Sequence, residues 1–424
     1  MLDRCVFDPQ NAPGAFALAA LACLCPLAMA QTSPWYVGVS QAVTHESNLY
    51  RIDTSTPIGL LSRSDMVSNT SLVAGLDQPI GRQRVHGNAK LGANRYRNND
   101  YLNDNSYVLT TGLDWATIER ISGGVRMVAS RNQRSFNVDS GPNVIETRKN
   151  NESVAQFDTS IRIGVVTPLT LEATLGHRRV QYSAPEYDGA EYRQGRGSLG
   201  ARYRPGIATF GASVGLADTR YAASPTQVAS VQAAERVRRT SLDLTVDWPA
   251  TGASSLYARL SPTRAAYDQF TQRDFSGLTG ALKWQWLPTG KLKVETRLVH
   301  DISQDSSFET FGGPVVVGTS NTGRTTTDLN VEVGYELTAK VAFNAVLGTS
   351  HRRLEQAANA AGLTTITATG SDDTSTLTLG AHWTARRSML LGCNMARAQR
   401  AASGGLTQDY RSTTLGCYGR FTLQ

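Results

Sequence analysis

The chain has 424 residues, of which 40% are hydrophobic and only 18% charged, and its mean hydropathy is −0.27. After residue 30 no segment reaches the roughly 18 consecutive apolar residues of a membrane-spanning helix, which excludes helical membrane proteins for that part. The formal net charge of +7 favours an anionic partner, either lipid headgroups or an acidic solute.

The N-terminus has the pattern of a signal peptide. Residues 15–30 (AFALAALACLCPLAMA) are apolar and end in Ala28-Met29-Ala30, a cleavage pattern of small residues before Gln31. We therefore expect residues 1–30 to be a signal peptide and residues 31–424 to be the mature protein, with a net charge one unit higher. The acidic residues Asp3 and Asp8 are atypical of a leader and question whether Met1 is the true start. A membrane anchor and a lipoprotein signal ending at Cys23 are the alternatives.

The mature sequence alternates apolar and polar residues with a period of two, which is typical of half-buried strands. Residues 84–94 carry Val85, Gly87, Ala89, Leu91 and Ala93 on one face and polar residues on the other. Residues 157–165, 242–248, 291–302 and 329–337 repeat this pattern. The alternation conceals the hydrophobicity of the strands from a bulk hydropathy average.

The predicted connections alternate strictly between short and long. Eight short ones centre near 79–81, 118–119, 167–168, 205–206, 249–252, 288–290, 338–340 and 385–387. Nine long ones cover roughly 49–63, 97–105, 137–152, 183–193, 222–235, 268–274, 303–323, 355–370 and 400–407. This rhythm predicts an all-β, antiparallel, up-and-down transmembrane barrel of about 18 strands in the bacterial outer membrane, with short periplasmic turns. A secreted sandwich or solenoid is the alternative, but no fixed sequence repeat supports a solenoid.

The tryptophans orient the predicted barrel. Each lies in the apolar register, either at the start of the first strand or just before a short turn, as expected of a periplasmic aromatic girdle: Trp35, Trp115, Trp248, Trp284, Trp286 and Trp383. Other aromatic residues near the long loops predict an outer girdle: Tyr107, Phe136, Tyr182, Tyr221, Tyr267 and Phe275. The last predicted strand, 413–423, resembles the C-terminal strand of outer-membrane proteins, although Phe421 is not its final residue.

The charged residues assign the inner face, because an Arg or Lys facing lipid at the membrane midplane costs about 2–4 kcal/mol. The predicted lumen-lining bases are Arg84, Lys90, Arg126, Arg162, Arg196, Arg202, Arg204, Arg259, Lys283, Lys291, Lys293 and Arg297. The acids of the same register include Asp158, Asp243, Asp247, Asp328, Glu332 and Glu336. Two interpretations stay open: paired charges that brace the barrel wall, and a path for an anionic solute.

Enzymatic chemistry has little support in the sequence. The six histidines form no metal-binding spacing and no G-x-S-x-G motif occurs, so we expect no enzyme activity, no metal and no cofactor. The bases alternate along strands instead of clustering with aromatic residues, so we also expect no nucleic-acid binding.

Cys393 and Cys417 would lie directly opposite each other if the residue numbers of each pair in the last hairpin sum to about 810. A disulfide and two buried thiols are both compatible with that placement.

The chain resembles the EpsL-type outer-membrane barrels associated with exosortase-linked exopolysaccharide systems. The resemblance covers most of the mature chain and rests on Pro34-Trp35-Tyr36-Val37-Gly38-Val39, Glu46-Ser47-Asn48-Leu49-Tyr50-Arg51, Ser64-Asp65 and Leu91-Gly92-Ala93-Asn94-Arg95-Tyr96. It implies export of an extracellular polysaccharide, with outer-membrane lipid and periplasmic export-machinery proteins as further partners, and it carries over no ligand residues.

The basic register alone favours the alternative function, a diffusion porin for small anionic or sugar solutes. The apolar loop 303–323 is a predicted constriction of the lumen, with packing on other outer loops as the alternative.

Overall fold

A computed structural model describes residues 33–118, 120–138, 145–222, 235–268, 271, 274–302, 322–358 and 366–424. The predicted signal peptide 1–30 and the proposed constriction loop at 303–321 lie outside these residues. The eighteen strands are β1 (Trp35–Glu46), β2 (Asp65–Ile80), β3 (Gln83–Tyr96), β4 (Asp104–Ala116), β5 (Ile121–Gln133), β6 (Asn151–Ile163), β7 (Leu169–Tyr182), β8 (Tyr192–Tyr203), β9 (Thr209–Tyr221), β10 (Arg236–Thr251), β11 (Ser254–Tyr267), β12 (Phe275–Trp286), β13 (Leu292–Ile302), β14 (Thr322–Glu336), β15 (Val341–Ala358), β16 (Ile366–Arg386), β17 (Met389–Ser403) and β18 (Tyr410–Leu423). Two short 3₁₀ helices, η2 (Asp100–Leu102) and η3 (Pro185–Ala190), lie in loops.

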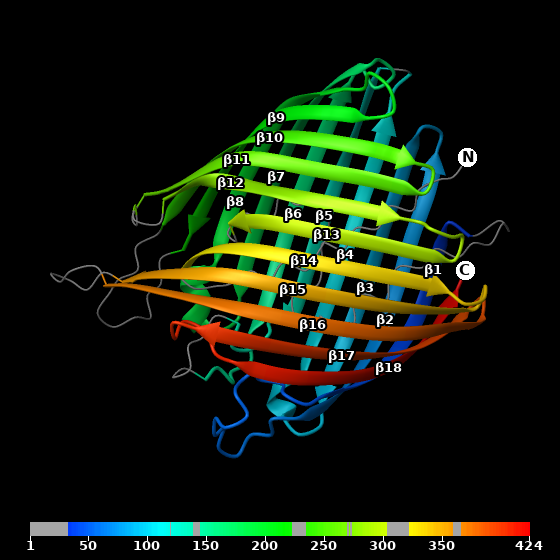
Figure 1. Cartoon of the computed structure of the whole chain (residues 1–424). Coiled ribbons are helices and arrows are strands. Elements are labelled where there is room, and N and C mark those ends of the chain that lie inside the picture. Colours follow the sequence, from blue (N-terminus) through cyan, green and yellow to red (C-terminus); the bar gives the residue numbers. More distant parts are fainter. Residues whose placement is uncertain are drawn as a thin grey trace.

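The strands form one closed sheet. Each strand pairs with its neighbours in sequence, and β1 pairs antiparallel with β18, from Val37 opposite Leu423 to Glu46 opposite Thr414. Closure leaves no unpaired edge, which is the condition for a sheet to cross a membrane. The predicted up-and-down barrel of eighteen strands is confirmed (Figure 1). No helix of the described residues is long and apolar enough to span a membrane.

The outer face of the barrel is apolar. Along each strand the outward residues are exposed leucines, valines and aromatics, such as Leu72 on β2, Leu91 on β3 and Leu175 on β7, whereas the intervening residues are more buried and mostly polar. A closed antiparallel barrel with this exterior is the architecture of bacterial outer-membrane proteins. The protein is therefore located in the outer membrane.

The two ends of the barrel differ. The short connections and both the start of β1 and the end of β18 lie at one end, to the right in Figure 1, which is the periplasmic end by the topology of such barrels. All six tryptophans lie on the outward register near this end, and five are clearly exposed, with Trp284 and Trp286 stacked at 5.7 Å between ring centroids. Their positions follow the predicted periplasmic girdle.

The predicted outer aromatic girdle is wrong for most of its members. Phe136, Tyr182, Tyr221, Tyr267 and Phe275 belong to, or pack against, buried clusters at the outer end of the molecule. Of the six, Tyr107 is the one that faces outward and is exposed. Proximity to a long loop did not determine the face, because moving the register by one residue reverses inside and outside.

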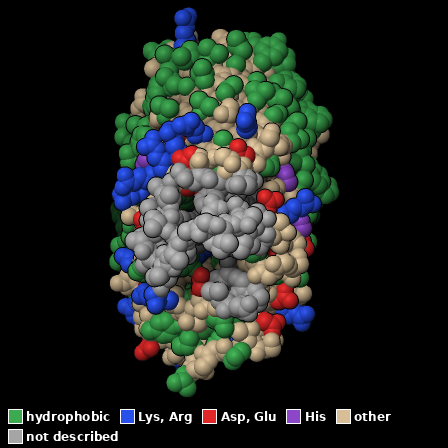
Figure 2. Space-filling model, turned by 90° about the vertical axis from the view of Figure 1, so that its left-hand side faces the viewer, with side chains coloured by type: hydrophobic (Ala, Val, Ile, Leu, Met, Phe, Trp, Pro, Cys, Tyr) green, Lys and Arg blue, Asp and Glu red, His purple; other side chains and the backbone are tan. Residues whose placement is uncertain are grey.

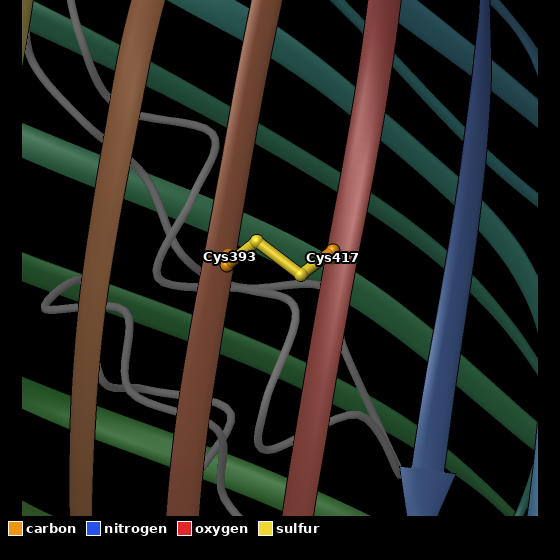
Figure 3. Close-up of a disulfide and its surroundings, with 2 residues drawn as sticks. All are labelled: Cys393 and Cys417. Atoms are coloured by element: carbon orange, nitrogen blue, oxygen red, sulfur yellow. A yellow bond between two sulfur atoms is a disulfide. The ribbon is translucent and has the colours of Figure 1, made fainter.

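Cys393 on β17 and Cys417 on β18 form a disulfide (Figure 3). They are directly opposite in the register, which sums to the predicted 810, and their Cα atoms are 4.0 Å apart. The bond lies on the outward face, beside Met395 and Leu415.

For a protein that comprises residues 31–424, we expect no reaction with a thiol reagent after denaturation without reduction, and two reactive thiols after reduction. Because the bond joins residues 24 apart, the chain-entropy model gives about 3 kcal/mol of stabilisation. Cys393→Ser/Cys417→Ser should therefore unfold at lower denaturant concentration. Two free thiols in the native protein would show that the bond does not form.

Candidate functional site: the lumen and the outer lid

Ten of the twelve predicted lumen bases lie on the inward register of their strands: Arg84, Lys90, Arg126, Arg162, Arg196, Arg202, Arg259, Lys283, Lys293 and Arg297. Arg204 lies just after β8 and Lys291 just before β13, both in periplasmic turns. There Arg204 Nε donates to Thr209 Oγ1 at 3.2 Å, and Lys291 Nζ donates to the Leu337 carbonyl at 3.3 Å. These two bases contribute to the periplasmic rim instead of the strand walls.

Most inward bases are paired with carboxylates on the same strand or on a strand one or two positions away. Glu295 on β13 contacts Lys283 at 3.3 Å, Lys293 at 3.4 Å and Arg297 at 2.8 Å. Glu172 on β7 contacts Arg162 at 3.2 Å and Arg202 at 2.7 Å. Single pairs join Arg84 to Asp77, Arg196 to Asp158 and Arg259 to Asp243. These pairs brace the wall, and two of the carboxylates are shared by more than one base.

Two inward bases differ from the rest. Lys90 lies on β3 and Arg420 on β18, in adjacent inward rows that run across β1 and β2 through Gly38, Val73, Ser40 and Ser71. Among the residues that the structure describes, no carboxylate pairs with either one. The Arg420 Nε and the nearby Ser71 Oγ and Tyr418 hydroxyl are buried without a hydrogen-bond partner. This cluster, the β18–β3 patch, is a set of donors that face the lumen.

Several inward carboxylates lie on β10 and β14. Glu332 and Glu336 on β14, and Asp243 and Asp247 on β10, face the lumen, as does Asp328 on β14. The inward bases Arg259, Lys283, Lys293 and Arg297 lie on β11, β12 and β13, between these two acidic strands. Acids and bases are therefore interleaved along this part of the lumen wall.

At the outer end, parts of three loops form a small domain that we call the outer lid: residues 47–64, 97–103, 134–138 and 145–150. Its core consists of Tyr50, Ile52, Leu102 and Phe136, all buried, with Tyr50 and Phe136 packed edge to face at 5.0 Å. Leu49, Ile58, Leu61, Tyr96 and Ile145 pack against this core. A shared apolar core makes the three loops one packed unit instead of independent loops.

Buried polar contacts join the loops of the outer lid. The Asp65 carboxylate accepts hydrogen bonds from the backbone N–H groups of Arg97, Asn98 and Asn99 at 2.9–3.0 Å. The Tyr50 hydroxyl lies 2.8 Å from Asn99 Oδ1 and 2.7 Å from the Tyr101 hydroxyl. Burial raises the pKa of Tyr50 and Tyr101, so both hydroxyls stay protonated at neutral pH.

The outer lid is fastened to the β15–β17 wall through residues 137 and 138. Arg400 on β17 donates to the carbonyls of Asn137 and Val138, each at 2.8 Å, and to the Gln408 carbonyl at 2.7 Å. Arg352 on β15 donates to the Val138 carbonyl at 3.1 Å while it pairs with buried Asp372. Asn137 adopts φ +49° and donates from Nδ2 to the Tyr50 carbonyl at 2.7 Å. The segment that follows β5 is thus held by β15 and β17, the tenth and twelfth strands after it in the chain.

Sequence reasoning placed the constriction in the loop after β13 and missed this anchor. Arg352 and Arg400 lie 214 and 262 residues from Val138, and their targets are backbone carbonyls, which carry no residue signature. The sequence carried one indication of this anchor, which is that both arginines lie in the inward register of their strands. The described residues contain no group of three or more potential metal ligands.

No protein-family model matches the chain. No curated protein matches it either. Solved structures of bacterial outer-membrane proteins are similar over 92% of the chain: the outer membrane protein OpdK of Pseudomonas aeruginosa (12% identity, 99% of that chain, TM-score 0.45), OccK2 (OpdF) of the same organism (11%, 98%, 0.47) and OccAB3 of Acinetobacter baumannii (9%, 99%, 0.45). The sequence identity is 12% or lower in each of these three cases.

Proposed function

We propose that this protein is a diffusion pore for small anionic solutes, including sugar acids. The β18–β3 patch carries the proposal, because Lys90 and Arg420 are unpaired with any described carboxylate and face the lumen of a barrel of eighteen strands. Barrels of 16–18 strands leave an aqueous channel. Unpaired bases on the wall of such a channel favour the entry of anions over cations.

The outer lid favours a small solute over a polymer. Its hydrophobic core and its anchor on Arg352 and Arg400 fix a folded segment at the outer end of the lumen. A polysaccharide chain would need that segment displaced during every export event. Export remains the function implied by the EpsL-type resemblance, and the small-solute pore is our preferred hypothesis.

Swelling of liposomes that contain the purified barrel tests this proposal. We expect a hexuronate to enter faster than a neutral hexose of the same size, and a long dextran to be excluded. Neutral sugar entering as fast as the acid would contradict anion preference. Loss of surface polymer with periplasmic accumulation in a deletion strain would favour export instead.

A further inference from the structure

A row of arginines crosses the outward face near the outer ends of four strands. Arg179 on β7 is directly opposite Arg193 on β8, Arg193 is opposite Arg220 on β9, and Arg220 is opposite Arg236 on β10. The neighbouring residues Arg178, Gln194, Thr219 and Val237 face inward, so the four arginines face outward. Arg238 on β10 and Arg264 on β11 extend the same side of the barrel and are exposed. We call these six residues the arginine row.

The row has little compensating charge. Asp218 on β9 is the one outward carboxylate within these strands, and it contacts Arg236 at 2.6 Å and Arg220 at 3.3 Å. Asp268, just after β11, accepts a hydrogen bond from the Arg236 backbone N–H at 2.8 Å and adds a second negative charge beside Arg236. Among the described residues, no carboxylate pairs with Arg179 or Arg193. Like charges directly opposite each other on neighbouring strands are destabilising. Three like-charged pairs in succession, only partly neutralised by Asp218, therefore favour the binding of an anion from outside the protein.

The surroundings of the row identify that anion as part of a lipid. Toward the periplasm, the outward residues of the same strands become apolar and exposed: Leu175, Leu199, Leu216 and Leu242. On the periplasmic side of Arg193, the outward positions 195 and 197 of β8 are both glycine. No atom lies within 4 Å of the point where a Cβ of residue 195 would be, so the surface beside Arg193 is open. Figure 2 shows Lys and Arg side chains gathered beside the apolar surface at the end of the molecule that carries the long loops. The arginine row thus lies at the boundary between the apolar band and the lipid headgroups of the outer leaflet.

We propose that the arginine row binds the phosphate groups of a phosphorylated glycolipid in the outer leaflet of the membrane. Arginine forms paired, charge-assisted hydrogen bonds with phosphate oxygens, and adjacent guanidinium groups on one row match an anion of more than one charge. The acyl chains of the same lipid would cover the exposed leucines beneath. This site lies outside the lumen and is independent of the solute that the pore conducts.

Native mass spectrometry of the detergent-purified mature barrel tests this, with added lipid A and with lipid A from which the phosphates have been removed. We expect the native protein to retain lipid A and not the dephosphorylated form. Arg179→Gln/Arg193→Gln should reduce retention by about tenfold or more, since two charge-assisted contacts are lost. The matched control is Arg131→Gln/Arg397→Gln, which removes two outward arginines whose cross-strand partners are Tyr107, Ser153, Leu377 and Thr413.

Equal retention by the Arg179/Arg193 variant, an equal loss in the control, or equal binding of dephosphorylated lipid would each overturn the proposal. Millimolar inorganic phosphate should not displace the lipid, and displacement would show a site for free phosphate instead. Heat-modifiable electrophoretic mobility confirms that each variant barrel is folded. Conductance should be unchanged in both variants, so failure of the lipid site and failure of the pore proposal are distinguishable.

Discussion

Arg400→Met should produce a pore with a larger and noisier conductance than the native protein. The native guanidinium donates three hydrogen bonds at 2.7–2.8 Å, two of them to the outer lid and one to the Gln408 carbonyl. Hydrogen bonds to a charged group contribute about 1.5–3 kcal/mol each, so losing this anchor raises the undocked population of the lid at least about tenfold. Methionine keeps the apolar stem against Tyr410, which the guanidinium covers at 4.9 Å. Single-channel recording in planar bilayers measures the change.

The control for this variant is Arg397→Met, which lies on the same strand but faces outward. It should leave conductance unchanged. A second readout is limited trypsin digestion, because Arg134, Arg148 and Lys149 lie in the loop that Arg400 holds. Arg400→Met should speed cleavage there, while Arg397→Met should not. Native conductance together with native protease resistance in Arg400→Met would show that the anchor does not hold the lid.

Lys90→Glu/Arg420→Glu should shift the ion preference of the pore from anions toward cations. Two unit charges 4 Å apart interact by about 1 kcal/mol in water, which corresponds to a change on the order of fivefold in the local concentration of an ion. Reversing two charges on one wall should therefore lower the ratio of chloride to potassium permeability by at least about fivefold. The reversal potential in a salt gradient measures this ratio.

The corresponding glutamine pair should fall between the native protein and the glutamate pair. Arg397→Glu, with the same kind of charge change on the outward face, should leave the ratio unchanged. A ratio that is insensitive to both Lys90 and Arg420 would show that ions do not pass the β18–β3 patch. The effect should shrink at high salt, because screening shortens the range of both charges.

The sequence was sufficient to predict the barrel because every strand of a barrel follows the same local pattern. Alternation with a period of two defines each strand and its faces, and turn residues such as Gly81 and Gly252 define its ends. Eight short connections separated by long ones then determine the strand number. Trp248 and Trp383 oriented the barrel because indole at an interface has an outward face and a preferred depth.

The outer lid and the arrangement of charges could be recognised only in the closed barrel structure. Arg400 reaches the carbonyls of Asn137 and Val138 because closure brings their strands to one end of the lumen, and nothing local in the sequence indicates that contact. The pairing of Lys293 and Arg297 with Glu295 depends on side-chain reach within one strand. Lys90 and Arg420, in contrast, lie in adjacent inward rows only because β1 pairs with β18. The arginine row required exact register, since Arg179, Arg193, Arg220 and Arg236 are scattered along 58 residues of sequence.

The reversal potential of the native protein in a planar bilayer, under a tenfold KCl gradient, tests the pore proposal most directly. It reports in one measurement whether the barrel conducts and which ion it prefers. We predict steady conductance with a reversal potential of the sign set by chloride. A barrel that inserts and folds but does not conduct, or one that prefers potassium, would contradict a diffusion pore for anions.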